Sequence, residues 1–233
     1  MAELHAPELA AIIERIRPTV LAGERVLPVN EVLRPVFPLG GLVRGTRVSV
    51  SGAGAASICM AVVAEASRTG SWVAVVGIGS WGWAAAAAAG LRLERSVFVA
   101  EPPAGQWGAV MAALVDAVDV VVVDPAHQVS ASDARRLTAR ARERGSVIVE
   151  VAIDDGRRRF RWPTEADLSL GVESISWDGL GVGHGAVGER VVGITTGGRR
   201  GAARSRTVHV RLGAAGRLIG SEGGSVHHLR SVG

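Results

Sequence analysis

Residues 46–67 read TRVSVSGAGAASICMAVVAEAS and contain a strand, a glycine loop and a helix in direct succession. Thr46–Val50 is predicted to be the first core strand, since a turn-rich lead-in precedes it and glycines end it. Ile58–Ser67 is apolar along most of its length and is predicted to be a helix. A buried strand that turns through glycines into a helix is typical of layered α/β domains.

Alternating strand and helix candidates continue from this stretch. Strands are expected at 72–76, 97–99, 119–123 and 147–151, and helices at 83–89, 107–117 and 132–144. Because the strands are nearly continuous runs of valine, we expect a parallel sheet with both faces covered. The six alanines at 84–89 are interpreted as core filler of their helix. Three later segments, at 167–176, 190–195 and 207–212, predict antiparallel strands that extend the sheet.

The chain divides into three parts on this interpretation. Residues 1–27 are expected to form an N-terminal helix, because residues 6–20 place apolar side chains at helical spacing. Residues 28–212 form the core domain, a three-layer α/β unit with a mostly parallel sheet and C-terminal antiparallel strands. Residues 213–233 are polar and glycine-rich and are expected to be disordered.

The composition restricts the function classes. All 26 basic residues are arginine, and the formal net charge is only +4. We interpret arginine-only usage as the codon bias of a high-GC genome rather than an adaptation to DNA. The single cysteine, Cys59, excludes an intrachain disulfide and cysteine-based zinc sites. No signal peptide and no apolar run of about 18 residues is present, so we expect a cytoplasmic protein without metal or membrane contact.

The glycine loop has the place of a phosphate-binding loop but not its chemistry. In the pattern GxxxxGK followed by Ser or Thr, lysine reaches the phosphates and the hydroxyl holds magnesium. Here Ser57, Ile58 and Cys59 stand where the second glycine, the lysine and the hydroxyl belong. We expect at most a vestigial nucleotide site, which the following residues would form: Gly52, Gly54, Ser57 and Asp124. Asp124 ends a valine strand, and capping of the turn there is an equally good interpretation.

Four segments, in this order, resemble the RecA-like ImuA family of actinobacterial mutagenesis proteins. They are PLGGLVRGTRVSVSG at 38–52, AGLRLERSVFV at 89–99, VDVVVVDPAHQV at 118–129 and ARRLTARARERGSVIVEV at 134–151. The resemblance covers about residues 28–212. It implies a RecA-like core in which Asp124 stands at the position of the magnesium-ordering aspartate.

The resemblance also implies a function. ImuA proteins act in DNA-damage-induced mutagenesis, the SOS response, beside the Y-family-like protein ImuB and an error-prone replicative-type polymerase in translesion synthesis. Ile78 occupies the position at which RecA has its water-activating glutamate, and the family's interface lysines cannot exist here. We therefore expect a non-catalytic scaffold without a cofactor, and homo-oligomerisation stays open. A weakly ATP-binding, recombinase-like ATPase is the alternative.

A second glycine loop supports a third interpretation. Gly77, Gly79 and Gly82 form a GxGxxG pattern after the second strand, and Glu101 follows the next strand. This arrangement is typical of Rossmann-type dinucleotide-binding enzymes. Against it, the pattern lies on the second strand rather than the first, and Trp81 would crowd the pyrophosphate.

Arginines suggest where a nucleic acid could bind. The stretch RRRFRW at 157–162 combines arginines for phosphates with aromatic rings for base stacking. A second basic stretch surrounds residues 199–206, and residues 136, 140 and 144 share one helical face. Solvated charge is the alternative for all of them. The candidate nucleic-acid-binding residues are Arg157, Arg158, Arg159, Phe160, Arg161, Arg199 and Arg200.

Overall fold

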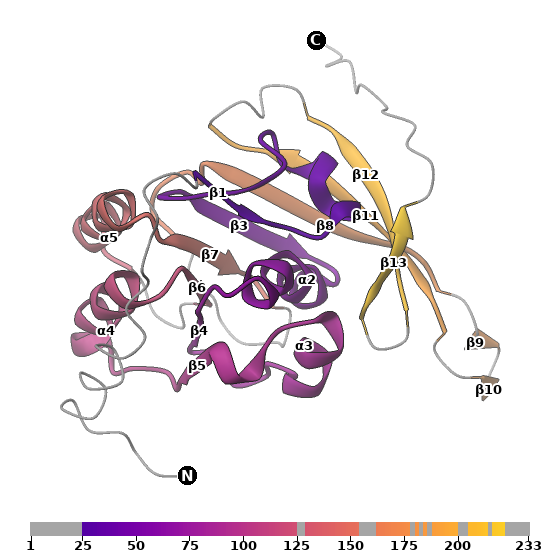
Figure 1. Cartoon of the computed structure of the whole chain (residues 1–233), viewed down its shortest axis with the longest axis horizontal. Helices are drawn as coiled ribbons and strands as arrows, with labels where there is room; N and C mark the ends of the chain where they lie inside the picture. The colour runs from indigo at the N-terminus through magenta and orange to yellow at the C-terminus, as the bar shows by residue number, and fades with distance from the viewer. Residues whose placement is uncertain are drawn as a thin grey trace.

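A mixed nine-stranded sheet forms the centre of the protein (Figure 1). The computed structural model describes residues 25–124, 129–153, 162–177, 180–181, 184–185, 188–199, 205–213 and 216–221. In order across the sheet, the strands are β13 (Leu218–Ser221), β12 (Thr207–Leu212), β11 (Arg190–Gly197), β8 (Leu168–Trp177), β3 (Arg47–Gly52), β7 (Val147–Val151), β6 (Val120–Val123), β4 (Val73–Val76) and β5 (Ser96–Val99).

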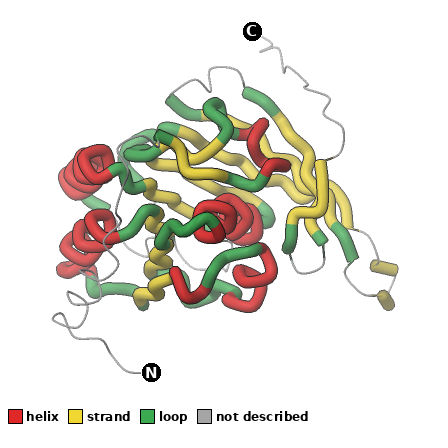
Figure 2. The backbone as a smooth tube through the Cα atoms, in the orientation of Figure 1, coloured by secondary structure: helices red, strands yellow, loops and turns green. Residues whose placement is uncertain are grey.

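The parallel half of the sheet runs from β5 to β8, and helices cover it on both sides (Figure 2). The helices are α2 (Ala55–Arg68) and α3 (Trp83–Ala89) on one face and α4 (Ala104–Ala117) and α5 (Ala131–Arg144) on the other. Every residue of β6 is fully buried, because its odd and even positions belong to the two different core layers. The predicted α/β class with a mostly parallel sheet is confirmed, and the arrangement is compatible with a RecA-like core.

The C-terminal strands correct one prediction. We expected all three late strands to be antiparallel additions, but β8 pairs in parallel with β3. The connection between β7 and β8, residues 152–167, is long enough for the crossover that parallel strands require. Antiparallel pairing begins one strand later, where β11 lies between β8 and β12.

The domain boundaries also shift. Strand β1 (Val26–Pro28) pairs with β2 (Gly41–Val43), so the folded core begins before residue 28. At the other end, β13 pairs with β12 inside the stretch predicted to be disordered. Strand β13 contains a leucine and an isoleucine and forms a short hairpin with β12. The prediction of disorder considered only the high glycine and polar content of residues 213–233 and missed this strand. Residues 1–24 and 222–233 lie outside the described residues.

Helix α3 differs from its interpretation as core filler. Of its six alanines only Ala86 is fully buried, while Ala84, Ala85, Ala87 and Ala88 are exposed. The helix spans only Trp83–Ala89 and packs mainly on α2, so a single stripe faces the core. Two short 3-10 turns, η1 (Glu31–Val36) and η2 (Leu93–Arg95), and a two-residue pair, β9 (Leu180–Gly181) with β10 (His184–Gly185), complete the fold. No helix among the described residues is long and apolar enough to cross a bilayer.

Candidate functional site

The first glycine loop lies between β3 and α2, as the sequence predicts. Gly52 and Gly54 have φ angles of 104° and 95°, in the region that favours glycine. A Cβ at Gly52 would lie 2.1 Å from the carbonyl oxygen of Val172 on β8, so no larger residue fits. Gly54 caps α2 without any side-chain hydrogen bond. The loop therefore brings backbone and helix N-terminus together as a phosphate-binding loop does.

The residues that replace lysine and hydroxyl point away from this loop. Ile58 and Cys59 are both 0% exposed and belong to the core between α2 and the sheet. Burial raises the pKa of the Cys59 thiol, so it stays protonated and apolar in character. Ser57, in the first turn of α2, is half-buried and lies near Gly216 of the β12–β13 turn. Neither Ile58 nor Cys59 can therefore place a positive charge or a magnesium ligand at the loop.

An arginine from a distant strand lies beside the loop instead. A Cβ at Gly54 would lie 3.3 Å from Nη1 of Arg190, the first residue of β11. The Arg190 guanidinium also stacks on the ring of Trp177, 5.1 Å from its centroid. Half-burial lowers the pKa of Arg190, and no ion pair joins it to a described carboxylate. Sequence reasoning missed this residue because β11 reaches the loop only through the sheet.

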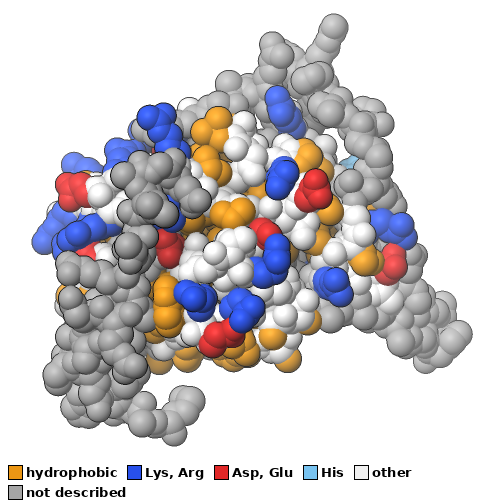
Figure 3. Space-filling model, viewed as in Figure 1, with side chains coloured by type: hydrophobic (Ala, Val, Ile, Leu, Met, Phe, Trp, Pro, Cys, Tyr) orange, Lys and Arg blue, Asp and Glu red, His pale blue; other side chains and the backbone are white. Residues whose placement is uncertain are grey.

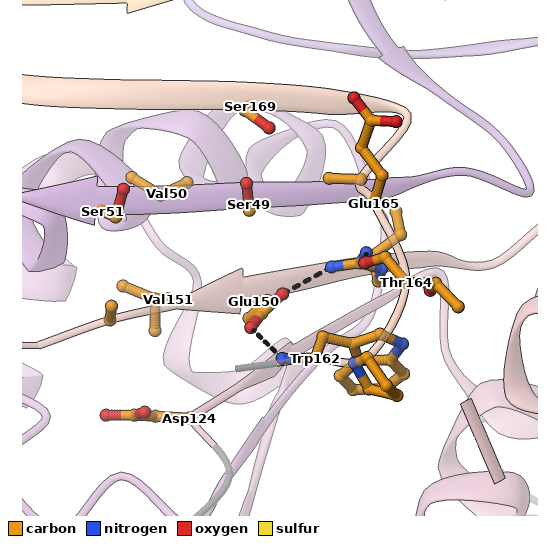
Figure 4. Close-up of a pocket in the computed structure, with 14 residues that line it drawn as sticks. Ser49, Val50, Ser51, Asp124, Glu150, Val151, Trp162, Thr164, Glu165 and Ser169 are labelled. Carbon is orange, nitrogen blue, oxygen red and sulfur yellow. Dashed lines mark hydrogen bonds and ion pairs between the residues drawn. The ribbon is translucent and has the colours of Figure 1, made fainter. Parts of the chain in front are cut away.

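Asp124 follows β6 at the carboxyl edge of the sheet and lines a cavity of about 430 Å³ (Figure 4). Ser51, the residue before Gly52, lines the same cavity, so Asp124 and the loop do lie at one edge. Among the described lining residues, Glu150 of β7 and Glu165 bring two further carboxylates, and Arg47 brings a guanidinium.

The cavity itself was not predicted. It lies over the sheet face where Glu150, Ser49 and Ser169 are in register on β7, β3 and β8. Their polar side chains form a row on the face opposite α2, beside the part of that face on which α4 and α5 pack. The alternation of Ser49 and Ser51 with Val48 and Val50 is the sequence signal that this strand has one polar face.

Arg47 holds the wall of this cavity together. Its guanidinium donates to Glu150 at 2.5 Å and to the carbonyl oxygen of Thr164, and it stacks 5.2 Å from the ring centroid of Trp162. The backbone nitrogen of Trp162 donates to the other Glu150 oxygen at 3.2 Å. Desolvation lowers the pKa of Arg47 although Glu150 and Asp167 oppose that shift. The network positions the chain directly after residues 154–161.

The second glycine loop has features that disfavour a dinucleotide. A Cβ at Gly77 would lie 2.1 Å from Oε2 of Glu101, so the carboxylate lies against the loop where a pyrophosphate would have to bind. Trp81 is buried in the core and contacts Trp83 edge to face, so the predicted crowding of a pyrophosphate by its side chain is wrong. Ile78, at the position of the RecA glutamate, is 2% exposed and also belongs to the core.

Most predicted nucleic-acid contacts fall outside the described residues, namely Arg157, Arg158, Arg159, Phe160, Arg161 and Arg200. Arg199 is described and exposed, 3.7 Å from Glu165. The helical face of residues 136, 140 and 144 is largely neutralised. Arg140 and Arg144 both bind Asp116 of α4, at 2.5 and 3.1 Å, and Arg136 lies 3.7 Å from Asp133. Solvated, internally paired charge is the better interpretation of that face.

These features define an α/β protein with a glycine loop between its first core strand and the following helix, and without a lysine or hydroxyl at the two helix positions that a phosphate-binding loop would use. Residues 35–157 match the family described as MT3502 N-terminal domain, which is slightly more than half of the chain, and the protein belongs to this family. The match runs from η1 through β7 and includes the glycine loop and Asp124, whereas β8 and β11 to β13 lie beyond it. No curated protein matches the chain.

Proposed function

We propose that the protein is a non-catalytic, RecA-like accessory protein of DNA-damage-induced mutagenesis. It would act in the cytoplasm as a scaffold for a Y-family-like partner of the ImuB kind and an error-prone polymerase in translesion synthesis. The observation that carries the non-catalytic part is the burial of Ile58 and Cys59, the residues in the lysine and hydroxyl positions. The choice of pathway rests on the resemblance of residues 28–212 to ImuA proteins.

Phosphoryl transfer depends on electrostatic stabilisation, so the missing groups matter more than the retained loop. The P-loop lysine, the magnesium hydroxyl and the water-activating carboxylate are replaced by Ile58, Cys59 and Ile78. Asp124 alone retains its residue type, and one carboxylate does not assemble a magnesium–nucleotide complex. This combination favours a scaffold over an ATPase.

Nucleotide binding without hydrolysis is the second candidate, and Arg190 favours it. Its guanidinium lies beside Gly54 at the N-terminus of α2, where the helix dipole is also positive. An anion at this point would interact favourably with both. Arg190 could thus replace part of the missing lysine charge from another strand.

Titration calorimetry with ATP and magnesium, and separately with NADH, tests the scaffold against these alternatives. The scaffold proposal expects no binding of either, and no phosphate release above a protein-free control. Micromolar binding of NADH supports the dinucleotide interpretation and ends the scaffold proposal. Micromolar ATP binding that is lost in Arg190→Gln but kept in Arg211→Gln supports the second candidate, because Arg211 pairs with Glu189 on the surface.

A pull-down of the full chain with candidate polymerase partners tests the scaffold role directly. The proposal expects a stable complex, and removal of residues 1–23 or 222–233 asks whether the ends carry the contact. The second truncation stops after β13, since that strand belongs to the sheet. Absence of any complex with ImuB-like and polymerase partners would reject the proposed role.

A further inference from the structure

A small cleft lies between one face of α5 and the segments that flank β8 and β11. Its volume is about 170 Å³. The helix contributes residues at i, i+3, i+4 and i+7, which form one stripe. The opposite wall comes from the chain before and at the start of β8 and from the end of β11. The lining residues are Arg47, Arg135, Thr138, Ala139, Arg142, Thr164, Glu165, Asp167 and Arg199.

Two of the arginines in this cleft, Arg135 and Arg142, form no ion pair with a described carboxylate, and a third, Arg199, has only an exposed one. Arg135 donates only to the backbone oxygen of Ala131, and Arg142 makes no ion pair with a described residue. Arg199 is 59% exposed and its only described carboxylate, Glu165, is 3.7 Å away. Basic side chains gather over α5 in the space-filling view (Figure 3).

The rest of α5 provides an internal comparison. Arg140 and Arg144 project from another face of the same helix and share Asp116 of α4. Arg140 donates to this carboxylate through Nε and Nη2, and Arg144 through Nε. Arg135 and Arg142 lie two turns apart, about 10 Å along the axis, with only Thr138 and Ala139 between them in the cleft. Small residues between two arginines leave room for a ligand to contact both.

Several arginines line the cleft together, so their positive charges repel one another. Arg199 lies close enough to Arg47 to add to the lowering of the Arg47 pKa, although burial is the larger cause. Glu150 compensates Arg47, whereas Glu165 and Asp167 are the carboxylates that the described lining places beside Arg135, Arg142 and Arg199. An anion between them would relieve this repulsion, and guanidinium groups bind phosphate oxygens in a forked geometry.

We propose that this cleft binds phosphate groups of a nucleic-acid strand, with Arg135, Arg142 and Arg199 as the contacts. A strand fits better than a free phosphate because the arginines are spread along the helix rather than focused on one point. The inference goes beyond the proposed scaffold role and does not depend on the polymerase partner.

Fluorescence anisotropy with a labelled single-stranded oligonucleotide tests it on the full chain. The variant is Arg135→Gln with Arg142→Gln, and the matched control is Arg140→Gln with Arg144→Gln, which removes the same charge from the same helix. For two lost phosphate contacts we expect affinity to fall roughly tenfold at about 50 mM salt. The slope of log K against log salt should become shallower by about 1.4, or 0.7 for each phosphate on a single strand. The control should bind within about twofold of the original protein.

The outcomes separate the sources of the phosphate and the role of net charge. Equal weakening of both double variants would mean that only net charge matters and would overturn the site, as would oligonucleotide binding by neither the original protein nor the variants. Inorganic phosphate is compared with chloride at equal ionic strength as a competitor of the oligonucleotide. If phosphate displaces it more strongly, and only when Arg135 and Arg142 are present, the cleft binds a small phosphate ligand instead.

Arg135→Lys with Arg142→Lys should restore the salt slope but not the full affinity, because lysine keeps the charge and loses the forked hydrogen bonds of arginine. Circular dichroism of every variant checks the fold, and an intact polymerase complex without oligonucleotide binding would reject the cleft while leaving the proposed function standing.

Discussion

Replacement of Arg47 by methionine should be among the most destabilising single changes on the polar face of the sheet. The Arg47 side chain is 4% exposed, and its partner Glu150 is 16% exposed. Removing one member of a buried ion pair costs about 3–5 kcal/mol, because the remaining charge stays buried without compensation. Glu150 keeps the hydrogen bond from the Trp162 backbone, so we expect the lower end, about 3 kcal/mol.

Urea denaturation measures this free energy of unfolding. With a slope of about 2 kcal/mol per molar urea, a loss of about 3 kcal/mol lowers the midpoint by about 1.5 M. The double variant Arg47→Met with Glu150→Met should recover most of the loss, since desolvation already opposes the charged pair. Arg92→Ala is the surface control: its pair with Glu94 is more than half exposed on both sides, and no measurable change is expected. A midpoint shift in Arg47→Met as small as in the control, or a double variant weaker than either single one, would refute the argument.

Three further predictions follow from burial and charge. Cys59 is fully buried with a raised thiol pKa, so iodoacetamide at pH 8 should label it only after unfolding in urea, and stoichiometric labelling of the folded protein would contradict its placement. Ala86→Glu should cost about 3 kcal/mol or more in urea unfolding because it buries an unpaired carboxylate, whereas Ala87→Glu on the exposed side of α3 should stay within about 0.5 kcal/mol. The Arg140 hydrogen bond lowers the pKa of Asp116 below its unfolded value near 3.9, so the stability it contributes is present above that pH and is lost as pH falls further. Thermal unfolding should therefore separate Asp116→Asn from the original protein at pH 7 but bring the two together near pH 2, and a constant separation would be inconsistent with this linkage.

Local pattern was sufficient for the parallel half of the fold. Strands β4 and β6 are apolar at every position, and β7 is apolar at every position except Glu150, as expected of strands buried on both faces. The positive φ angles of the glycine loop separate β3 from α2. The same reasoning failed where pairing decides the outcome. The direction of β8 depends on a crossover through residues 152–167, and β13 is a strand only because β12 offers it a free edge.

The site shows the same division between local and long-range information. The loss of the lysine and hydroxyl could be predicted from positions 58 and 59 alone, because it concerns residue types at fixed spacing. The approach of Arg190 to Gly54 could not, since β11 lies some 136 positions later in the chain and reaches the loop beside β8. The loop has no lysine of its own, but strand pairing in the sheet places an arginine from β11 beside it. This arginine can be identified only from the three-dimensional structure.

Helix α5 shows why counting arginines does not locate a binding surface. The helical periodicity of its sequence predicts two basic faces with two arginines each. One has Arg140 and Arg144, and the other has Arg135 and Arg142. The difference between them arises from Asp116 on the preceding helix, which pairs with both arginines of the first face, whereas Arg135 and Arg142 form no ion pair with a described carboxylate. Because a guanidinium that already holds a carboxylate must give it up before it binds a phosphate, the unpaired face is the one that can bind nucleic acid without this cost. The position of the carboxylates, more than the number of arginines, therefore decides where an anion binds on this protein.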